Sequence, residues 1–270
     1  MTTQLTTGRT TTDHPSGGGS APPSRHRRTP ALVAVTLVVA ALVLAWTAPR
    51  RTDTRTEVLM TDPERIVVDV NGRVSVAAGD ETSVTVEREW AWVGAPDTSV
   101  DLENGVLHVR GRCGVHGLVP GRCLTHVNAT VARGTEVAVT TSAGTVSVTG
   151  TTGGVDLRTS AGRVDVTDVA GPARLHSSAG AIAGTVNGGD VNASTAAGSI
   201  ALDVTGDPGH LSATSRAGGV TLTVPDHTYA VDFDTSAGDV ELDVRIDLDA
   251  TRRITARSSA GDITIRRTAQ

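Results

Sequence analysis

A four-residue motif, Ser/Thr-x-Ala-Gly, returns seven times in the second half of this chain. Its glycines are Gly144, Gly162, Gly180, Gly198, Gly218, Gly238 and Gly261, so successive copies lie 18, 18, 18, 20, 20 and 23 residues apart. A nearly fixed period of this length indicates a solenoid, in which each repeat stacks on its neighbour and contacts little else. The sequence therefore predicts an array of coils of about 18 residues each.

Apolar residues stand at fixed distances from these glycines, seven and five residues before and two and four residues after. The column two residues after the glycine consists of Val146, Val164, Ile182, Ile200, Val220, Val240 and Ile263. Within a coil these positions are two residues apart, which is the period of a β-strand, and helical spacing is absent from residue 57 onward. We therefore predict an all-β fold, a single-stranded parallel β-solenoid of the β-helix or β-roll kind. Each coil has two short strands, and whether the cross-section has two sides or three stays open.

Two corners join the strands of each coil. One corner is the Ala-Gly pair, because a tight turn needs a small inward residue and one that tolerates positive φ. The Ser or Thr three residues before each glycine forms a column that can hydrogen-bond from coil to coil. Every insertion falls at the opposite corner, after Val204, Val224 and Val244, and solenoids present binding loops at such an edge. Our candidate contact residues are therefore Asp207, His210, Asp226, His227, Tyr229, Arg252 and Arg253.

The N-terminal part differs sharply in composition. Residues 1–28 are rich in Thr, Ser, Gly, Pro and Arg, which predicts a disordered tail. Residues 29–48 contain Ala31–Ala48, eighteen residues without a charge, and predict one transmembrane helix. A cleaved signal peptide is the alternative, but Trp46 stands where cleavage requires a small residue. We expect the N-terminus in the cytoplasm, a linker over 49–62 and an extracytoplasmic C-terminal domain in the cell membrane.

Residues 63–131 carry looser versions of the same unit and predict irregular coils that cap the regular solenoid of residues 132–267. The two cysteines, Cys113 and Cys123, fall in a Gly-rich loop of this part. Beyond a membrane anchor they predict a disulfide in an oxidising compartment. Zinc held with the nearby His116 and His126 is one alternative, and free thiols or cross-links to a partner are others.

Trp90 and Trp92 precede this cysteine loop on one side of a strand. They predict either a hydrophobic plug of the cap or an aromatic platform for a sugar, and we favour the plug.

Charge and missing motifs exclude several classes of function. Beyond the predicted span, 24 − 4 = 20 Arg face 29 − 1 = 28 acidic residues, a net charge of −8, which argues against nucleic acid as a partner. The Gly- and Asp-rich repeat of calcium-binding β-rolls is absent. The outward acidic residues are scattered, and no histidine stands at a suggestive spacing from a Ser or Cys. We therefore expect no catalysis, no cofactor and no metal.

The run Thr141-Ser142-Ala143-Gly144-Thr145-Val146-Ser147-Val148, with similar runs starting at Thr159 and Thr235, resembles the putative-adhesin family of bacterial envelope proteins. The resemblance covers roughly residues 63 to 267. It implies a domain of β-strand repeats, in many members behind an N-terminal membrane helix. It defines no functional residues, so none are assigned from it.

These observations together favour a membrane-anchored, non-catalytic cell-surface protein with an adhesin-like binding or scaffold role. Its expected partner is an unknown envelope protein or a cell-wall glycan. The alternative function is a sensing or regulatory subunit of an envelope-stress system. An enzyme that acts on polysaccharides is a more remote alternative.

Overall fold

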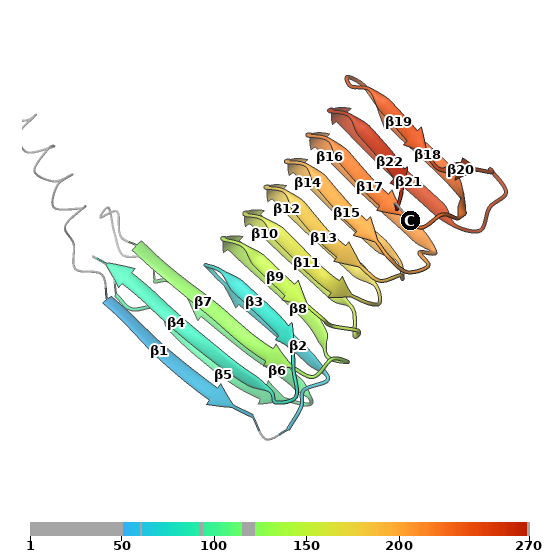
Figure 1. Cartoon of the computed structure of the whole chain (residues 1–270). Coiled ribbons are helices and arrows are strands. Elements are labelled where there is room, and N and C mark those ends of the chain that lie inside the picture. The colour runs from blue at the N-terminus through green and yellow to red at the C-terminus, as the bar shows by residue number, and fades with distance from the viewer. Residues whose placement is uncertain (1–50, 60, 92–93, 115–121, 269–270) are drawn as a thin grey trace, which may run out of the picture. The chain divides into compact units, whose positions relative to one another are not determined.

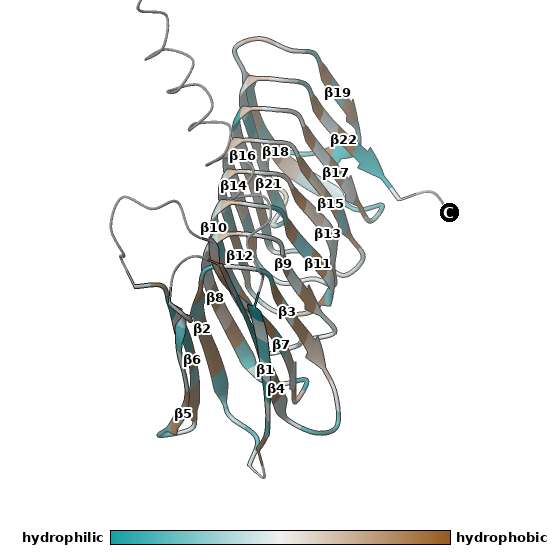
Figure 2. Ribbon diagram, turned by 90° about the vertical axis from the view of Figure 1, so that its left-hand side faces the viewer, coloured by the Kyte–Doolittle hydropathy of each residue, from teal (hydrophilic) through white to brown (hydrophobic). Residues whose placement is uncertain are grey.

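The computed structural model describes residues 51–59, 61–91, 94–114 and 122–268, and within them the regular secondary structure is β-strand throughout. The strands form two sheets of eleven strands each, which lie face to face (Figures 1 and 2). In spatial order the first sheet contains β1 (Arg51–Val58), β4 (Ser83–Ala91), β7 (Arg122–Val131), β3 (Val74–Ala78), β9 (Val146–Thr149), β11 (Val164–Val169), β13 (Ile182–Val186), β15 (Ile200–Val204), β17 (Val220–Val224), β22 (Ile263–Arg267) and β19 (Val240–Asp243). The second sheet contains β20 (Arg245–Ile246), β18 (Thr228–Thr235), β21 (Arg253–Ala260), β16 (His210–Ala217), β14 (Val191–Ala197), β12 (Ala173–Ala179), β10 (Val155–Ala161), β8 (Glu136–Ala143), β2 (Arg65–Val70), β6 (Val106–Arg112) and β5 (Asp97–Glu103).

The predicted tail and transmembrane segment, residues 1–48, lie outside the described residues. In the part that is described, there is no helix with the length and apolar character needed to span a membrane.

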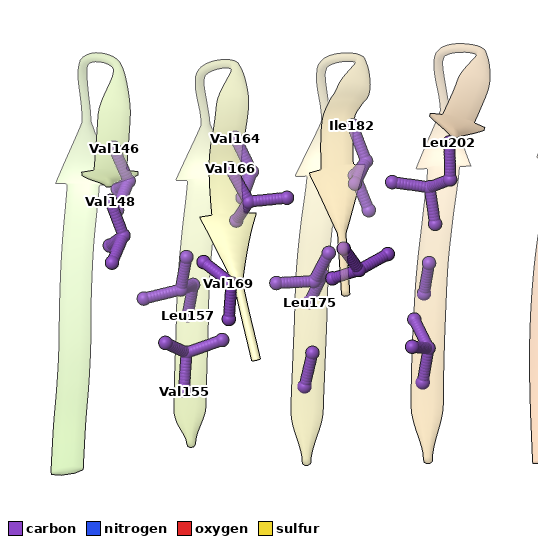
Figure 3. Close-up of a cluster of buried hydrophobic side chains, with 14 of the residues drawn as sticks. Val146, Val148, Val155, Leu157, Val164, Val166, Val169, Leu175, Ile182 and Leu202 are labelled. Atoms are coloured by element: carbon purple, nitrogen blue, oxygen red, sulfur yellow. The ribbon is translucent and has the colours of Figure 1, made fainter. Parts of the chain in front are cut away.

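The core lies between the two sheets, because each coil contributes one strand to each sheet. In the first sheet, Val164 of β11 stands in register with Val146 of β9 and with Ile182 of β13, and Ile182 with Ile200 of β15. These side chains are fully buried and face those of the second sheet, among them Leu157 (Figure 3). Strand alternation places every second side chain in this layer. The prediction of an all-β, solenoid-like domain with stacked apolar columns is confirmed, and both sheets consist mainly of parallel strands.

The Ala-Gly corner explains the strictest part of the repeat. A Cβ atom on Gly180 would lie 1.9 Å from the carbonyl oxygen of Gly162 in the coil below, so only glycine fits at this close approach. The Ser177 hydroxyl donates to the Gly162 carbonyl oxygen at 3.0 Å, and Thr195 repeats the bond to Gly180 at 2.9 Å. The expected hydroxyl column therefore links coil to coil, except at Thr159, whose buried hydroxyl has no hydrogen-bond partner among the described residues. The alanine of the corner, however, is exposed, as at Ala179, and the expectation of an inward alanine was wrong.

The coils do not stack in chain order at the C-terminal end. The last coil of the chain, β21–β22, lies between β16–β17 and β18–β19, so the outermost position belongs to the coil before it (Figure 1). The hydroxyl column follows this order, since Ser258 donates to the Gly218 carbonyl oxygen and Thr235 to that of Gly261, both at 3.1 Å. Stacking of each repeat on its neighbour in sequence is therefore wrong for these coils. The longest repeat spacing, 23 residues, gives the chain the reach to step back over one coil.

At the N-terminal end the coils again stack out of chain order, and the cap differs from that of the C-terminal end. The first coil, β2–β3, lies between β6–β7 and β8–β9, and its Gly72 accepts the column hydrogen bond from Thr141 at 2.9 Å. Beyond it, β4 pairs antiparallel with β7 and β1, and β5 pairs antiparallel with β6. The sequence predicted parallel coils here. Side chains alternate with a period of two residues in parallel and antiparallel strands alike, so the sequence pattern does not distinguish the two kinds of pairing.

The two cysteines lie at the end of this cap. The sulfurs of Cys113 and Cys123 are bonded, with Cα atoms 6.0 Å apart. Bonded sulfurs cannot serve as thiolate ligands, and Nδ1 of His126 already accepts a backbone hydrogen bond at 2.9 Å, so neither these sulfurs nor this ring nitrogen is free to bind zinc. Trp90 is half-buried in register with Cys123, whereas Trp92 lies outside the described residues. That the exported protein carries the disulfide stays a prediction.

Candidate binding site

The structure brings the three inserted corners together. These corners are residues 205–209, 225–227 and 247–252, at the edge opposite the Ala-Gly turns. Arg252 of the last corner forms a two-pronged ion pair with Asp207 of the first, with Nη2 2.9 Å from Oδ2. The hydrogen bond from Arg252 lowers the pKa of the Asp207 carboxyl and in turn raises the pKa of Arg252. The pair joins corners that are 45 residues apart in the chain.

A second charged contact braces the middle corner. Asp226 Oδ1 lies 3.1 Å from Arg245 Nη2 and 3.8 Å from Arg267 Nη1, at ion-pair distance although without hydrogen-bond geometry. Arg245 also donates to the Asp226 carbonyl oxygen at 2.7 Å. Arg267 donates to Asp243 of β19 at 2.8 Å, and this hydrogen bond raises the pKa of Arg267. Most charged side chains of this corner therefore have a partner of opposite charge within the protein.

Tyr229 has no exposed surface and cannot contact a partner. Its hydroxyl donates to the Pro225 carbonyl oxygen at 3.0 Å, and burial raises its pKa to about 12. It is the second residue of β18 and lies on the inward side of the alternation, which explains why it packs in the core. His227 is half-buried, with its ring centroid 6.4 Å from that of Tyr229. Of the predicted contact residues, His210 and Arg253 remain exposed and unbraced, side by side in register on β16 and β21.

A shallow hollow of about 360 Å³ lies on the outer face of the second sheet, across β10, β12 and β14. Its polar lining consists of Asp156, Arg158, Arg174, His176, Asn192 and Ser194. The parallel register arranges these residues in two rows that run from coil to coil, one from Asp156 through Arg174 to Asn192 and one from Arg158 through His176 to Ser194.

Among the described residues, the interactions within the hollow leave one arginine without an ion pair. Arg158 binds Asp156 through Nε and Nη2, both at 3.0 Å. His176 Nδ1 lies 2.9 Å from the Ser194 hydroxyl. Arg174 is exposed and forms no ion pair with any described residue. The hollow therefore offers a planar guanidinium together with neutral groups that exchange hydrogen bonds.

Comparison with known proteins shows to which family this fold belongs. A model of the Toastrack DUF4097 family matches residues 74–267, which include nearly all of the parallel coils. The chain belongs to the Toastrack DUF4097 family. The resemblance to bacterial adhesin-like proteins drawn from the repeat motif is thereby confirmed.

Several solved structures resemble this Toastrack chain. A putative cell adhesion protein from Clostridium sporogenes is 11% identical, with 80% of this chain and 100% of that chain covered and a TM-score of 0.32. A putative adhesin from Parabacteroides distasonis is 16% identical, with 81% and 97% covered and a TM-score of 0.37. A putative lipid binding protein from the same organism is 14% identical, with the same coverage and a TM-score of 0.35. A comparison with curated proteins finds no match.

The hollow is the feature of the Toastrack array that sequence reasoning missed. Asp156, Arg174 and Asn192 all stand six residues before a repeat glycine, and Arg158, His176 and Ser194 all stand four before. In a solenoid, equal positions of successive repeats become neighbours. Reading the outward columns in the same way as the inward ones would have found both rows.

Metal binding finds no support in the described part of the Toastrack chain. No three side chains of His, Cys, Asp or Glu gather there in a way that could hold a metal ion.

Proposed function

We propose that this Toastrack protein is a non-catalytic, adhesin-like protein of the cell envelope. In this proposal residues 29–48 anchor it in the cell membrane, the N-terminus is cytoplasmic, and the β-array stands outside. The array binds a glycan that carries carboxylate or phosphate groups. The observation that carries the proposal is the hollow on the second sheet, where Arg174 has no ion-pair partner among the described residues.

The chemistry of the hollow fits such a ligand. A guanidinium presents a planar fork of N–H donors that matches carboxylate and phosphate oxygens. Arg174 has this fork available, and Arg158 stands beside it with its charge balanced by Asp156. The Asn192 amide and the His176–Ser194 pair can exchange hydrogen bonds with sugar hydroxyl groups. The hollow is therefore locally basic on a domain that is acidic as a whole.

The shape of the hollow favours one face of a polymer over an enclosed small molecule. Its volume of about 360 Å³ is near the lower end of ligand sites, which is roughly 300 Å³. Its rows continue across strands that are about 4.8 Å apart in a sheet. Rigid strands hold these side chains at fixed spacing, so little order is lost when a linear chain binds along them.

The experiment compares binding of three polymers to the full-length protein in detergent micelles. The polymers are a polyuronate, a poly(glycerol phosphate) and neutral dextran, and affinity is measured by isothermal titration calorimetry. We expect binding of an anionic polymer but not of dextran. We expect Arg174→Gln to weaken that binding by about tenfold or more, because a charged hydrogen bond contributes roughly 1.5–3 kcal/mol.

The matched control is Arg216→Gln, which removes an exposed arginine on β16 of the same sheet, outside the hollow. It should bind as the unchanged protein does. Equal binding by the Arg174 and Arg216 variants would remove the hollow from the proposal. Tight binding of dextran would contradict the anionic ligand.

A further inference from the structure

The two ends of the array are finished differently. At the N-terminal end, the last strands of the two sheets, β1 and β5, are antiparallel to their neighbours. At the C-terminal end, the parallel coil β18–β19 is the last layer, and no strand of the described chain lies beyond β19 in its sheet. In the second sheet, β20 covers only Thr228 and Tyr229, so Ala230–Thr235 of β18 has a strand neighbour on one side alone. Such an edge presents unpaired backbone N–H and C=O groups to an added strand.

At this end the apolar columns of the core end in side chains that are exposed to solvent. Among the described residues, the exposed large apolar side chains in this coil and the turn after it are Phe233 (45% exposed), Val240 (36%), Ile246 (49%) and Leu248 (79%). Phe233 continues the column of the fully buried Ala256, and Val240 continues that of the fully buried Ile263. Soluble repeat arrays normally end in a polar outer face. Here the last layer has the core-facing pattern, and no layer formed by the described residues covers it.

The outward side chains of the same two strands are acidic. Asp232 and Asp234 alternate with Phe233 on β18, and Glu241 and Asp243 flank the half-buried Leu242 on β19. Arginines of the coil below bind two of these acids, with Arg257 2.8 Å from Asp232 and Arg267 2.8 Å from Asp243.

The other two, Asp234 and Glu241, form no ion pair with any described residue. Opposite charges on adjacent strands stabilise their pairing and like charges oppose it.

These features together specify the partner. A strand added to β18 or β19 places its inward residues over Phe233 or Val240 and its outward residues beside Asp234 or Glu241. Its inward residues must therefore be apolar and its outward residues basic. A second copy that met this end with its own C-terminal coil would bring acid against acid, which disfavours self-association of this kind.

We propose that the open C-terminal end of the array binds, by β-strand addition, an extended segment of another protein in which apolar residues alternate with Arg or Lys. Backbone hydrogen bonds to the free edge give affinity, and the alternation gives specificity. This surface is separate from the hollow on the second sheet, and either can be correct without the other.

The test uses full-length protein in detergent micelles and three labelled peptides, with binding followed by fluorescence anisotropy. One peptide alternates Val and Arg, one has the same composition with Val and Arg in separate blocks, and one alternates Val and Glu. We expect only the first to bind. Hydrogen exchange should then show protection of backbone amides in 230–235 or 240–243, and equal binding of the first two peptides or protection elsewhere would overturn the proposal.

Charge reversal provides a second arm. The double variant Asp234→Arg/Glu241→Arg should weaken binding of the Val-Arg peptide by about tenfold and begin to bind the Val-Glu peptide. Asp203→Arg, at an exposed acid of β15 with β17 and β22 between it and β19, should change neither. Unchanged binding by the double variant would refute strand addition at this end. A concentration-dependent dimer of the free protein that the double variant abolishes would assign the end to a second copy instead.

Discussion

Alkaline pH should destabilise this protein through one residue. Tyr229 is the single tyrosine of the chain, and burial raises its pKa from 10.0 to about 12. All 24 basic residues are arginine, and the two cysteines are bonded to each other. Near pH 9 to 11 no lysine or thiol therefore titrates, and Tyr229 is the one side chain whose ionisation is expected to change.

The sign and size of the effect follow from proton binding. Between about pH 10 and pH 12 the unfolded chain has lost the phenolic proton while the folded chain keeps it, so stability falls as pH rises. At pH 11 a group with pKa 10.0 unfolded and about 12 folded lowers the free energy of unfolding by about 1.3 kcal/mol relative to pH 9. The loss approaches about 2.7 kcal/mol for the full shift of roughly two pKa units.

Two measurements check this. Ultraviolet absorbance of tyrosinate follows the ionisation of Tyr229 directly in folded protein and in denaturant. Urea unfolding at about pH 9 and pH 11 gives the difference in stability. In Tyr229→Phe, which removes the titrating group, the same change of pH should leave stability nearly constant. A folded-state pKa near 10, or an equal loss of stability in the Phe variant, would refute the reasoning.

Other predictions concern the repeat and its cap. Gly180→Ala should lower the free energy of unfolding by about 2 kcal/mol or more, because its Cβ meets a backbone carbonyl, whereas Gly134→Ala, with nothing within 4 Å of the new atom, should stay within about 0.5 kcal/mol in denaturant titrations. Ile200→Asp buries an unpaired charge and should abolish cooperative melting by circular dichroism, which an unchanged transition would contradict. Thiol labelling without reductant, before and after denaturation, should detect neither Cys113 nor Cys123 in exported protein, and full labelling would reject the disulfide.

The repeat contains most of the information on the fold. Equal spacing identified which residues face inward, and the buried registers of Val146, Val164, Ile182 and Ile200 agree with it. The order in which coils stack did not follow, because the last two coils carry the same residue pattern and either could occupy either layer. The order is decided by how the segments that connect the coils run in three dimensions.

The candidate contact residues were harder to predict for a different reason. The insertions correctly located a variable corner, but sequence alone did not reveal that Arg252 would bind Asp207 across 45 residues. Tyr229 was taken for a loop residue although it lies within strand β18, so its burial was missed. The rows through Arg174 and His176 became visible only when parallel register made them neighbours.

The non-sequential stacking has a consequence for synthesis. Residues 253–267 are translated after β18 and β19, yet they form the layer between that coil and β16–β17. Until they are available, β19 has no strand neighbour and β18 pairs only with the two residues of β20. A ribosome that stops before Arg253 therefore leaves two layers unformed instead of one. Termination between β19 and β21, which shortens an ordinary repeat array by a single unit, would here also remove the strand partners of a coil that had already been made.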